Sequence, residues 1–213
     1  MGLKNTSLSY GSIAKWLHWI IAFLFLGAYM SVYYRHYLTV EDTPENWTAL
    51  QLHLSIGMTI GVFVLLRIIW RLMNDTPSLE PGSRWEHLAA KLGHIALYAI
   101  MIVMPLTGYI GTGVNTELFL LTDITKFENT TLFDWLVNNK LGMTFEEFEE
   151  PVDFIHKEIG GKWVVWLLIL VHFSAAMYHH FVKKDRTLSK MGLERHRKSV
   201  IDQRSPHQAN DKN

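Results

Sequence analysis

Four long apolar stretches, each with histidine within it or beside it, constrain this 213-residue chain more than any other feature. They run over residues 16–34, 52–73, 92–114 and 160–182. At about 1.5 Å of helix rise per residue, each stretch can cross a hydrocarbon core of about 30 Å. The sequence therefore predicts an all-α fold, a four-helix transmembrane bundle with both chain ends on one side of the membrane.

The distribution of Lys and Arg predicts which side that is. Segments on the cytoplasmic side of membrane proteins are enriched in these residues. Here they concentrate near the N-terminus, between the second and third stretches, and after residue 182. The connections on the opposite side are much longer and hold few of them. We therefore expect both termini to be cytoplasmic.

A single membrane domain is expected over residues 1–182, and its third connection is unusually long. This connection, residues 115–155, is rich in Glu and Asp and would lie on the outer side. Within it, Leu132, Phe133, Leu136 and Val137 recur at helical spacing, which predicts a short amphipathic helix on the outer membrane surface. We favour a solvated loop over a lid that covers an outer site.

The end of the chain, residues 183–213, differs in composition from the spans. It is polar and charged and has few large apolar groups. Such a segment cannot bury enough apolar surface to offset the entropy lost on folding. The sequence therefore predicts a flexible cytoplasmic tail here.

Composition excludes several classes of partner and cofactor. The 20 Lys and Arg are balanced by 20 Asp and Glu, so the chain lacks the basic surplus that binds a nucleic-acid backbone, and no nucleic acid is expected as partner. Cysteine is absent, which excludes disulfides, thiolate-bound iron–sulfur clusters, sulfur-ligated zinc and covalent haem attachment. Histidine, methionine and oxygen donors remain as metal ligands.

Four histidines sort into two depths in the predicted topology. His18 lies near the inner end of the first span, whereas His53 lies near the outer end of the second. His156 precedes the fourth span on the outer side, and His172 lies about 24 Å further along an ideal helix. Two imidazole pairs at different depths suit two b-type haems, because a flat macrocycle between facing helices takes one axial nitrogen from each side.

Four sequence segments together resemble the bacterial cytochrome b561 family. They are WLHW at 16–19, LHLSIGMTIGVFVLLRIIWRL at 52–72, MPLTGYIG at 104–111, and VHFSAAMYHHFVKKDRTLSKM at 171–191. The resemblance implies a four-helix protein of the bacterial inner membrane, surrounded by lipid and binding two haems b without covalent attachment. It also implies electron transfer to the quinone pool, with superoxide as donor and ubiquinone as acceptor in the best-characterised type. We also consider a homodimer.

The resemblance implies specific axial ligands in this sequence. His18 would pair with His172 at the inner haem, and His53 with His156 at the outer haem. Arg67, near the inner end of the second span, is a candidate to neutralise a propionate of the inner haem. We assign no catalytic residues, because no nucleophile or general base is visible. Any enzymatic activity would be that of a superoxide:ubiquinone oxidoreductase.

Two features of the fourth span leave alternatives open. The family pattern spaces its two ligands by two heptads, but His156 and His172 are 16 residues apart, which turns the second about 160° away on an ideal helix. A helix start or a bulge at the Gly160–Gly161 pair would restore a common face. His179, seven residues after His172, is a rival ligand for the inner haem.

Two other functions remain open from the sequence. One is the membrane-anchoring cytochrome b subunit of a hydrogenase or dehydrogenase, which would form a stable complex with an iron–sulfur subunit. The other is a divalent-metal transporter, which would be a colourless protein that binds zinc. Such a transporter would need carboxylates inside the spans, and these are missing.

Overall fold

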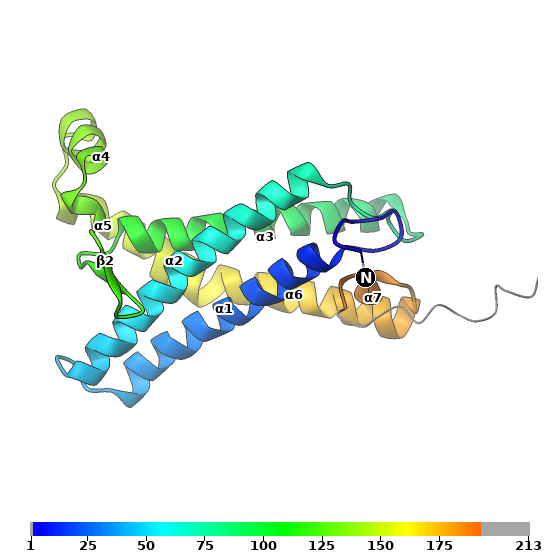
Figure 1. The fold of residues 1–213 in the computed structure, drawn as a ribbon, viewed down its shortest axis with the longest axis horizontal. Helices are drawn as coiled ribbons and strands as arrows, with labels where there is room; N and C mark the ends of the chain where they lie inside the picture. Colours follow the sequence, from blue (N-terminus) through cyan, green and yellow to red (C-terminus); the bar gives the residue numbers. More distant parts are fainter. Residues whose placement is uncertain (1, 193–213) are drawn as a thin grey trace, which may run out of the picture.

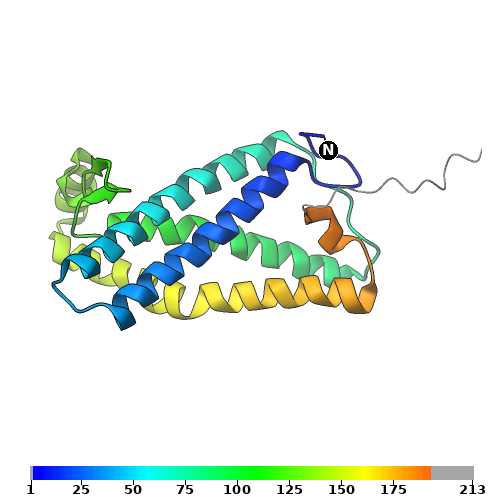
Figure 2. The same ribbon diagram turned by 60° about the horizontal axis from the view of Figure 1, so that its bottom comes forward.

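The computed structural model describes residues 2–192 and shows four long helices that run side by side (Figures 1 and 2). They are α1 (Ser12–Leu38), α2 (Pro44–Met73), α3 (Arg84–Ile110) and a fourth helical run over Phe145–Lys183. Each is long and apolar enough to cross a membrane. The predicted four-helix bundle is confirmed.

The fourth helix begins well before the apolar stretch at residue 160. Its segments are α5 (Phe145–Asp153), the π-helical η3 (Phe154–Val164), α6 (Val165–Tyr178) and the π-helical η4 (His179–Lys183). A capping box explains the early start: the Thr144 side chain accepts from the backbone of Glu147, whose carboxylate accepts from the backbone of Thr144. The acidic first turns therefore extend the helix outward beyond its apolar part.

α1 and α2 form the most closely packed pair of long helices. Their shared core contains Ile21 and Ala28 of α1 and Ile56, Ile60 and Val64 of α2, all buried. Lipid is as apolar as these side chains, so close van der Waals packing rather than transfer out of water holds such helices together. This pairing fixes the positions of His18 and His53, which belong to the same two helices.

The long third connection folds into a lobe at one end of the bundle, which we call the outer lobe, residues 115–144 (Figure 1). It contains the antiparallel hairpin of β1 (Thr116–Leu118) and β2 (Thr122–Ile124), then η1 (Phe127–Asn129), α4 (Thr131–Phe133) and the π-helical η2 (Asp134–Leu141). Phe127, Phe133 and Val137 pack with Phe145 into a second buried cluster. The expected solvated loop is thus replaced by a folded lobe, because its aromatic residues bury one another.

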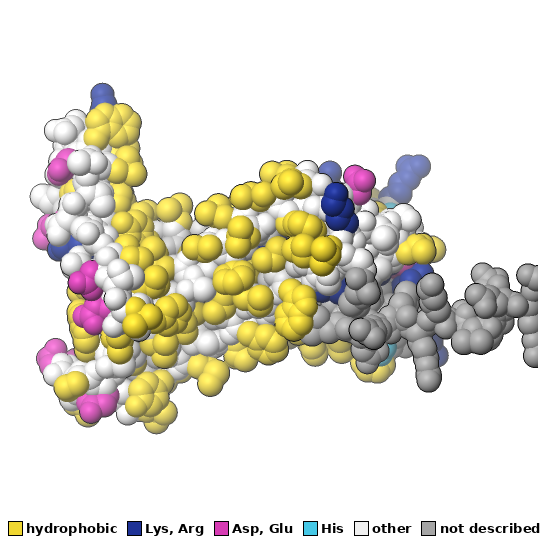
Figure 3. Space-filling model, in the orientation of Figure 1, with side chains coloured by type: hydrophobic (Ala, Val, Ile, Leu, Met, Phe, Trp, Pro, Cys, Tyr) yellow, Lys and Arg dark blue, Asp and Glu magenta, His cyan; other side chains and the backbone are white. Residues whose placement is uncertain are grey.

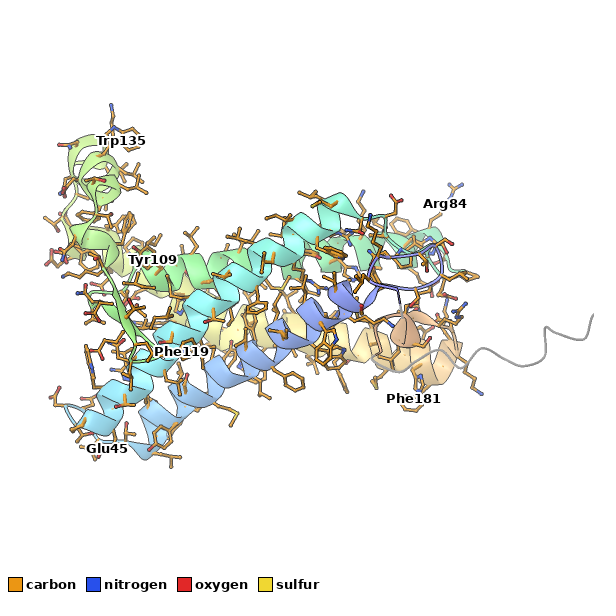
Figure 4. The ribbon with its side chains drawn as sticks, viewed as in Figure 1. Glu45, Arg84, Tyr109, Phe119, Trp135 and Phe181 are labelled. Atoms are coloured by element: carbon orange, nitrogen blue, oxygen red, sulfur yellow. The ribbon has the colours of Figure 1, made fainter. Side chains whose placement is uncertain are left out.

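The hairpin of the outer lobe is fixed to α2 by two buried polar side chains. Gln51 donates to the carbonyl of Asn115 at 3.0 Å and accepts from the backbone of Glu117 at 2.8 Å. Ser55 donates to the Glu117 carbonyl and accepts from the backbone of Phe119. A buried polar group left without such partners costs about 1–3 kcal/mol. Figure 4 shows Phe119 in this hairpin and Trp135 at the far tip of the lobe.

The opposite end of the bundle joins three segments that are distant in sequence. Ser78, in the α2–α3 connection, donates to the Ser7 carbonyl at 2.8 Å. Lys190 donates to the Ser78 carbonyl at 2.8 Å and pairs with Glu80. Lys190 belongs to α7 (Thr187–Met191), so the N-terminal segment and α7 lie at the same end of the bundle.

The tail is predicted to be flexible from residue 183 onward. Its first residues instead fold back against the end of the fourth helix and form α7. Asp185 links the end of the fourth helix to α7, because His179 Nδ1 and the Thr187 backbone both contact its carboxylate. Burial alone would raise the pKa of Asp185, but these hydrogen bonds outweigh it and hold the pKa below its ordinary value. Residues 193–213 of the predicted tail lie outside the described residues.

Charged side chains gather at the two ends of the molecule. Figure 3 shows apolar side chains over the length of the bundle, most carboxylates at the lobe end and most Lys and Arg at the other end. An apolar belt between two polar ends is the surface expected of a protein that crosses a bilayer.

Candidate functional site

His53 and His156 face each other near the outer lobe. His53 comes from α2 and His156 from η3, and their ring centroids are 6.3 Å apart with an interplanar angle of 77°. Two imidazoles bound in line to one metal through bonds of about 2 Å would have ring centroids about 6 Å apart. The outer pair predicted from the sequence is therefore brought together at a separation suited to axial ligation.

His18 and His172 face each other nearer the other end. Their ring centroids are 6.2 Å apart, with an interplanar angle of 65°. His18 comes from α1 and His172 from α6. The structure thus brings together both predicted pairs, each from two different helices. The two pairs lie at different positions along the bundle.

The π-helical segment η3 explains how His156 and His172 can both face the bundle interior. A π-helix bonds i to i+5 and so has more residues per turn than an α-helix. The rotation accumulated over 16 residues is smaller than on an ideal α-helix, which brings the second histidine back towards the face of the first. Of the two alternatives raised by Gly160–Gly161, the structure shows the bulge rather than a helix start.

The two glycines of η3 lie against neighbouring helices, Gly160 against α3 and Gly161 against α1. A Cβ at Gly160 would collide with Met104 Sδ, so α3 could not approach as closely if this residue had a side chain. The carbonyl of Gly161 accepts a hydrogen bond from the Tyr29 hydroxyl at 2.7 Å. The bulge is therefore packed against α3 and bonded to α1.

Hydrogen bonds fix the ring orientation of the outer pair. His53 Nδ1 lies 3.1 Å from the Ala28 carbonyl, and His156 Nδ1 lies 3.0 Å from Thr107 Oγ1. A carbonyl only accepts, so His53 carries its proton on Nδ1 and leaves Nε2 as a neutral acceptor. A ligating histidine almost always has such a partner on its other nitrogen. Sequence reasoning missed Thr107, although it lies in the MPLTGYIG segment.

The inner pair lacks this support. Within residues 2–192, the ring nitrogens of His18 and His172 have no hydrogen-bond partner. His172 is exposed although it lies inside an apolar helix. Neither ring is therefore committed to a hydrogen bond among these residues.

Arg67 lies beside the inner pair. It donates to the carbonyl of Ala14 at 3.3 Å, one helical turn before His18, and its guanidinium lies 5.9 Å from the ring centroid of Tyr98. Arg71 lies 5.6 Å from the centroid of the same ring. Two cations on one aromatic ring at this depth could accommodate an anionic group. No sequence pattern singled out Tyr98 for this position.

His179 is not placed as a rival of His172. Its Nδ1 contacts Asp185 and lies 3.3 Å from Thr187 Oγ1, so the ring is engaged at the end of η4. His172, not His179, faces His18. His94 of α3 lies close to His172 as well, with ring centroids 6.3 Å apart.

The donor set fits haem better than a divalent ion held by several side chains. Among residues 2–192, no group of three or more His, Asp or Glu side chains is arranged to hold a metal ion. The histidines instead pair at a separation that leaves room for one metal between two rings, in an apolar surrounding without thiolates. This is the ligand pattern of a bis-histidine haem.

A substitution at Gly108 tests whether the His53–His156 pair depends on close helix packing. A Cβ there would lie 2.9 Å from His156 Cε1, so Gly108→Ala should displace the His156 ring and lower the occupancy or low-spin fraction of any haem held by the His53–His156 pair. Absorption spectra of the purified variant would measure this. Gly93→Ala in the same helix meets nothing within 4 Å and serves as control. An unchanged outer haem in Gly108→Ala would contradict the proposed position of His156.

Comparisons with known proteins identify a family and several relatives of this chain. A sequence model described as prokaryotic cytochrome b561 matches residues 9–193. The chain is 28% identical over 197 residues to cytochrome b561 homolog 2 of Escherichia coli, covering 90% of this chain and 95% of that protein. It is 26% identical to cytochrome b561 homolog 1 of the same organism, covering 83% and 92%. It is 23% identical to a probable superoxide oxidase CybB of Yersinia pestis, covering 85% and 94%.

Proposed function

The chain belongs to the prokaryotic cytochrome b561 family, a family of haem-containing membrane electron-transfer proteins, and we propose that it carries two haems b and moves single electrons across the bilayer. The observation that carries this proposal is the presence of two imidazole pairs, with centroids 6.2 and 6.3 Å apart, towards opposite ends of one bundle. Two redox centres at different depths give an electron an intermediate position within the membrane.

We assign His53 and His156 to the outer haem and His18 and His172 to the inner haem. Each bound haem would supply the one-electron redox change at its iron. The protein contributes the ligands, their orientation and the charge around them. Ala28 and Thr107 orient the outer imidazoles, the helices exclude water, and Arg67 supplies positive charge beside the inner pair. Arg67 is our candidate partner for an inner propionate.

The orientation follows from the charge distribution. The end with the N-terminal segment and α7 carries most Lys and Arg, which supports a cytoplasmic location for both termini. The outer lobe would then lie on the periplasmic side of the inner membrane. This orientation also places the His53–His156 pair nearer the outer face and the His18–His172 pair nearer the cytoplasm.

We propose ubiquinone as acceptor and superoxide as one outer donor. The name of the Yersinia pestis relative supports this kind of donor. The alternatives to a free-standing monomer are a homodimer and a complex with a hydrogenase or dehydrogenase. A homodimer would elute at twice the protein mass in detergent, whereas such a complex would copurify with an iron–sulfur subunit.

The charge at the lobe end predicts how superoxide oxidation depends on salt. The carboxylates there would repel an anion such as superoxide, and salt weakens this repulsion. Haem reduction by superoxide should therefore accelerate as ionic strength rises, which stopped-flow absorbance at the haem bands would measure. A rate that falls with added salt would contradict entry of superoxide past the acidic lobe.

The test of the function is a haem count combined with an electron-transfer assay. Detergent-purified protein should give a reduced-minus-oxidised b-type spectrum and two haems per chain by pyridine haemochrome. In liposomes containing ubiquinone, superoxide generated outside should reduce the haems and then the quinone. A protein without Soret absorbance after expression with ample haem supply would contradict the proposal. Two haems without superoxide oxidation would contradict only the donor.

A further inference from the structure

The inner site contains a third imidazole that the proposed function does not use. His94 of α3 lies with its ring centroid 6.3 Å from that of His172, and the interplanar angle is 76°. The His18–His172 pair has nearly the same separation, 6.2 Å. His172 thus has two imidazole neighbours at the distance expected of axial partners, whereas His53 and His156 form a single pair in the part of the chain described.

A hydrogen bond fixes the tautomer of His94, whereas none fixes that of His18 within residues 2–192. Its Nδ1 lies 2.7 Å from the carbonyl of Ala90, an acceptor, so the proton is on Nδ1 and Nε2 is free. The His18 ring has no comparable hydrogen bond within residues 2–192. Ligating histidines almost always have their second nitrogen bonded, and both outer histidines follow this rule. On this criterion His94 resembles a ligand more closely than His18 does.

The three inner rings do not form an ordinary three-ligand metal site. No group of three or more His, Asp or Glu side chains in residues 2–192 is arranged to hold one ion. The ring of His94 is exposed, and its Nε2 has no partner among these residues, so His94 is not engaged in a structural bridge between helices. If His94 is an alternative partner of His172, this role explains both the 6.3 Å between their ring centroids and the free Nε2 of His94.

We propose that His94 is a second ligand-competent partner of His172 at the inner haem, so that either His18 or His94 can occupy the axial position opposite His172. This inference rests on the proposed function, because it requires an inner haem held by His172. It gives the inner site two alternative bis-histidine pairs. The outer site has one such pair among the described residues.

Single and double variants, purified in detergent, test this proposal by haem count and by spin state in absorption and electron paramagnetic resonance spectra. His18→Ala should keep two haems per chain, both six-coordinate and low-spin, because His94 replaces the lost ligand. His94→Ala should also keep two low-spin haems. The double variant should fall to one low-spin haem, with the inner haem absent or five-coordinate and high-spin.

Added imidazole distinguishes a filled axial position from an open one. It should leave the spectrum of His18→Ala unchanged and convert any high-spin inner haem of the double variant to low spin. The proposal is overturned if His18→Ala alone loses the inner haem or becomes high-spin. Retention of the outer haem and monodisperse elution show that a variant is folded. If His18→Ala does not fold, a His94→Ala spectrum with an open inner position would assign His94 as the sole partner and equally overturn the proposal.

The outcomes also separate this inference from the proposed function. A wild-type protein with fewer than two haems contradicts the proposed function itself. A wild-type protein with two haems, whose His18→Ala variant has one, contradicts only the role of His94.

Discussion

His53→Ala is expected to lower the haem content from two per chain to one and to leave the inner haem low-spin. The reason is that His53 comes from α2 and faces His156 across the outer half of the bundle, with ring centroids 6.3 Å apart. The hairpin binds Gln51 and Ser55, which lie on the opposite face of α2 from His53, so removing the imidazole leaves the outer lobe attached. Pyridine haemochrome and redox titration measure the result.

His36→Ala is the matched control for this variant. His36 is exposed near the C-terminal end of α1, and Tyr37 is its only aromatic-ring neighbour among the described residues. We expect this variant to keep both haems. Loss of both haems in His53→Ala, or of neither, would show that the two sites are not separated by depth.

His172→Ala is expected to remove the inner haem and to abolish electron transfer from the outer face to quinone at the inner face. His172 is central to the inner site, because His18 and His94 both face it at 6.2 and 6.3 Å. His18 and His94 would both lose the ring that they face, and His179 is engaged by Asp185. One low-spin haem should remain, and it should still accept electrons from the outer side.

The measurement is quinone reduction in liposomes, together with the haem count. His180→Ala serves as control, because His180 is exposed in η4 and its ring packs against Phe181. Figure 4 shows Phe181 at the end of the bundle opposite the outer lobe. Undiminished transmembrane transfer in His172→Ala would contradict a route through the inner haem.

The outer lobe shows where sequence reasoning reaches its limit. Helical spacing of Leu132, Phe133, Leu136 and Val137 correctly indicates helical structure, but the expectation of a solvated loop is wrong. Phe133 and Val137 are instead buried against Phe127 and Phe145. Which side of an amphipathic segment is covered depends on partners from elsewhere in the chain, and periodicity alone does not name them.

The sequence by itself determined the number of spans and their α-helical nature, and it predicts the depth of each histidine. Hydropathy and the fixed rise of a helix suffice for this, because a bilayer leaves a chain few ways to satisfy its backbone. Rotation about the helix axis is not fixed in this way. Whether His156 and His172 share a face was decided by the π-helical η3, which forms where Gly160 allows Met104 of α3 to approach.

Only the tertiary structure determined which side chains contact each histidine. The approach of His94 to His172 depends on how α3 packs against α6, and the hydrogen bond between Thr107 and His156 joins residues 49 positions apart. Contacts of this kind arise from the packing of several helices at once. Local sequence patterns report the depth of a side chain in the membrane, but the direction in which it points follows from the packed bundle.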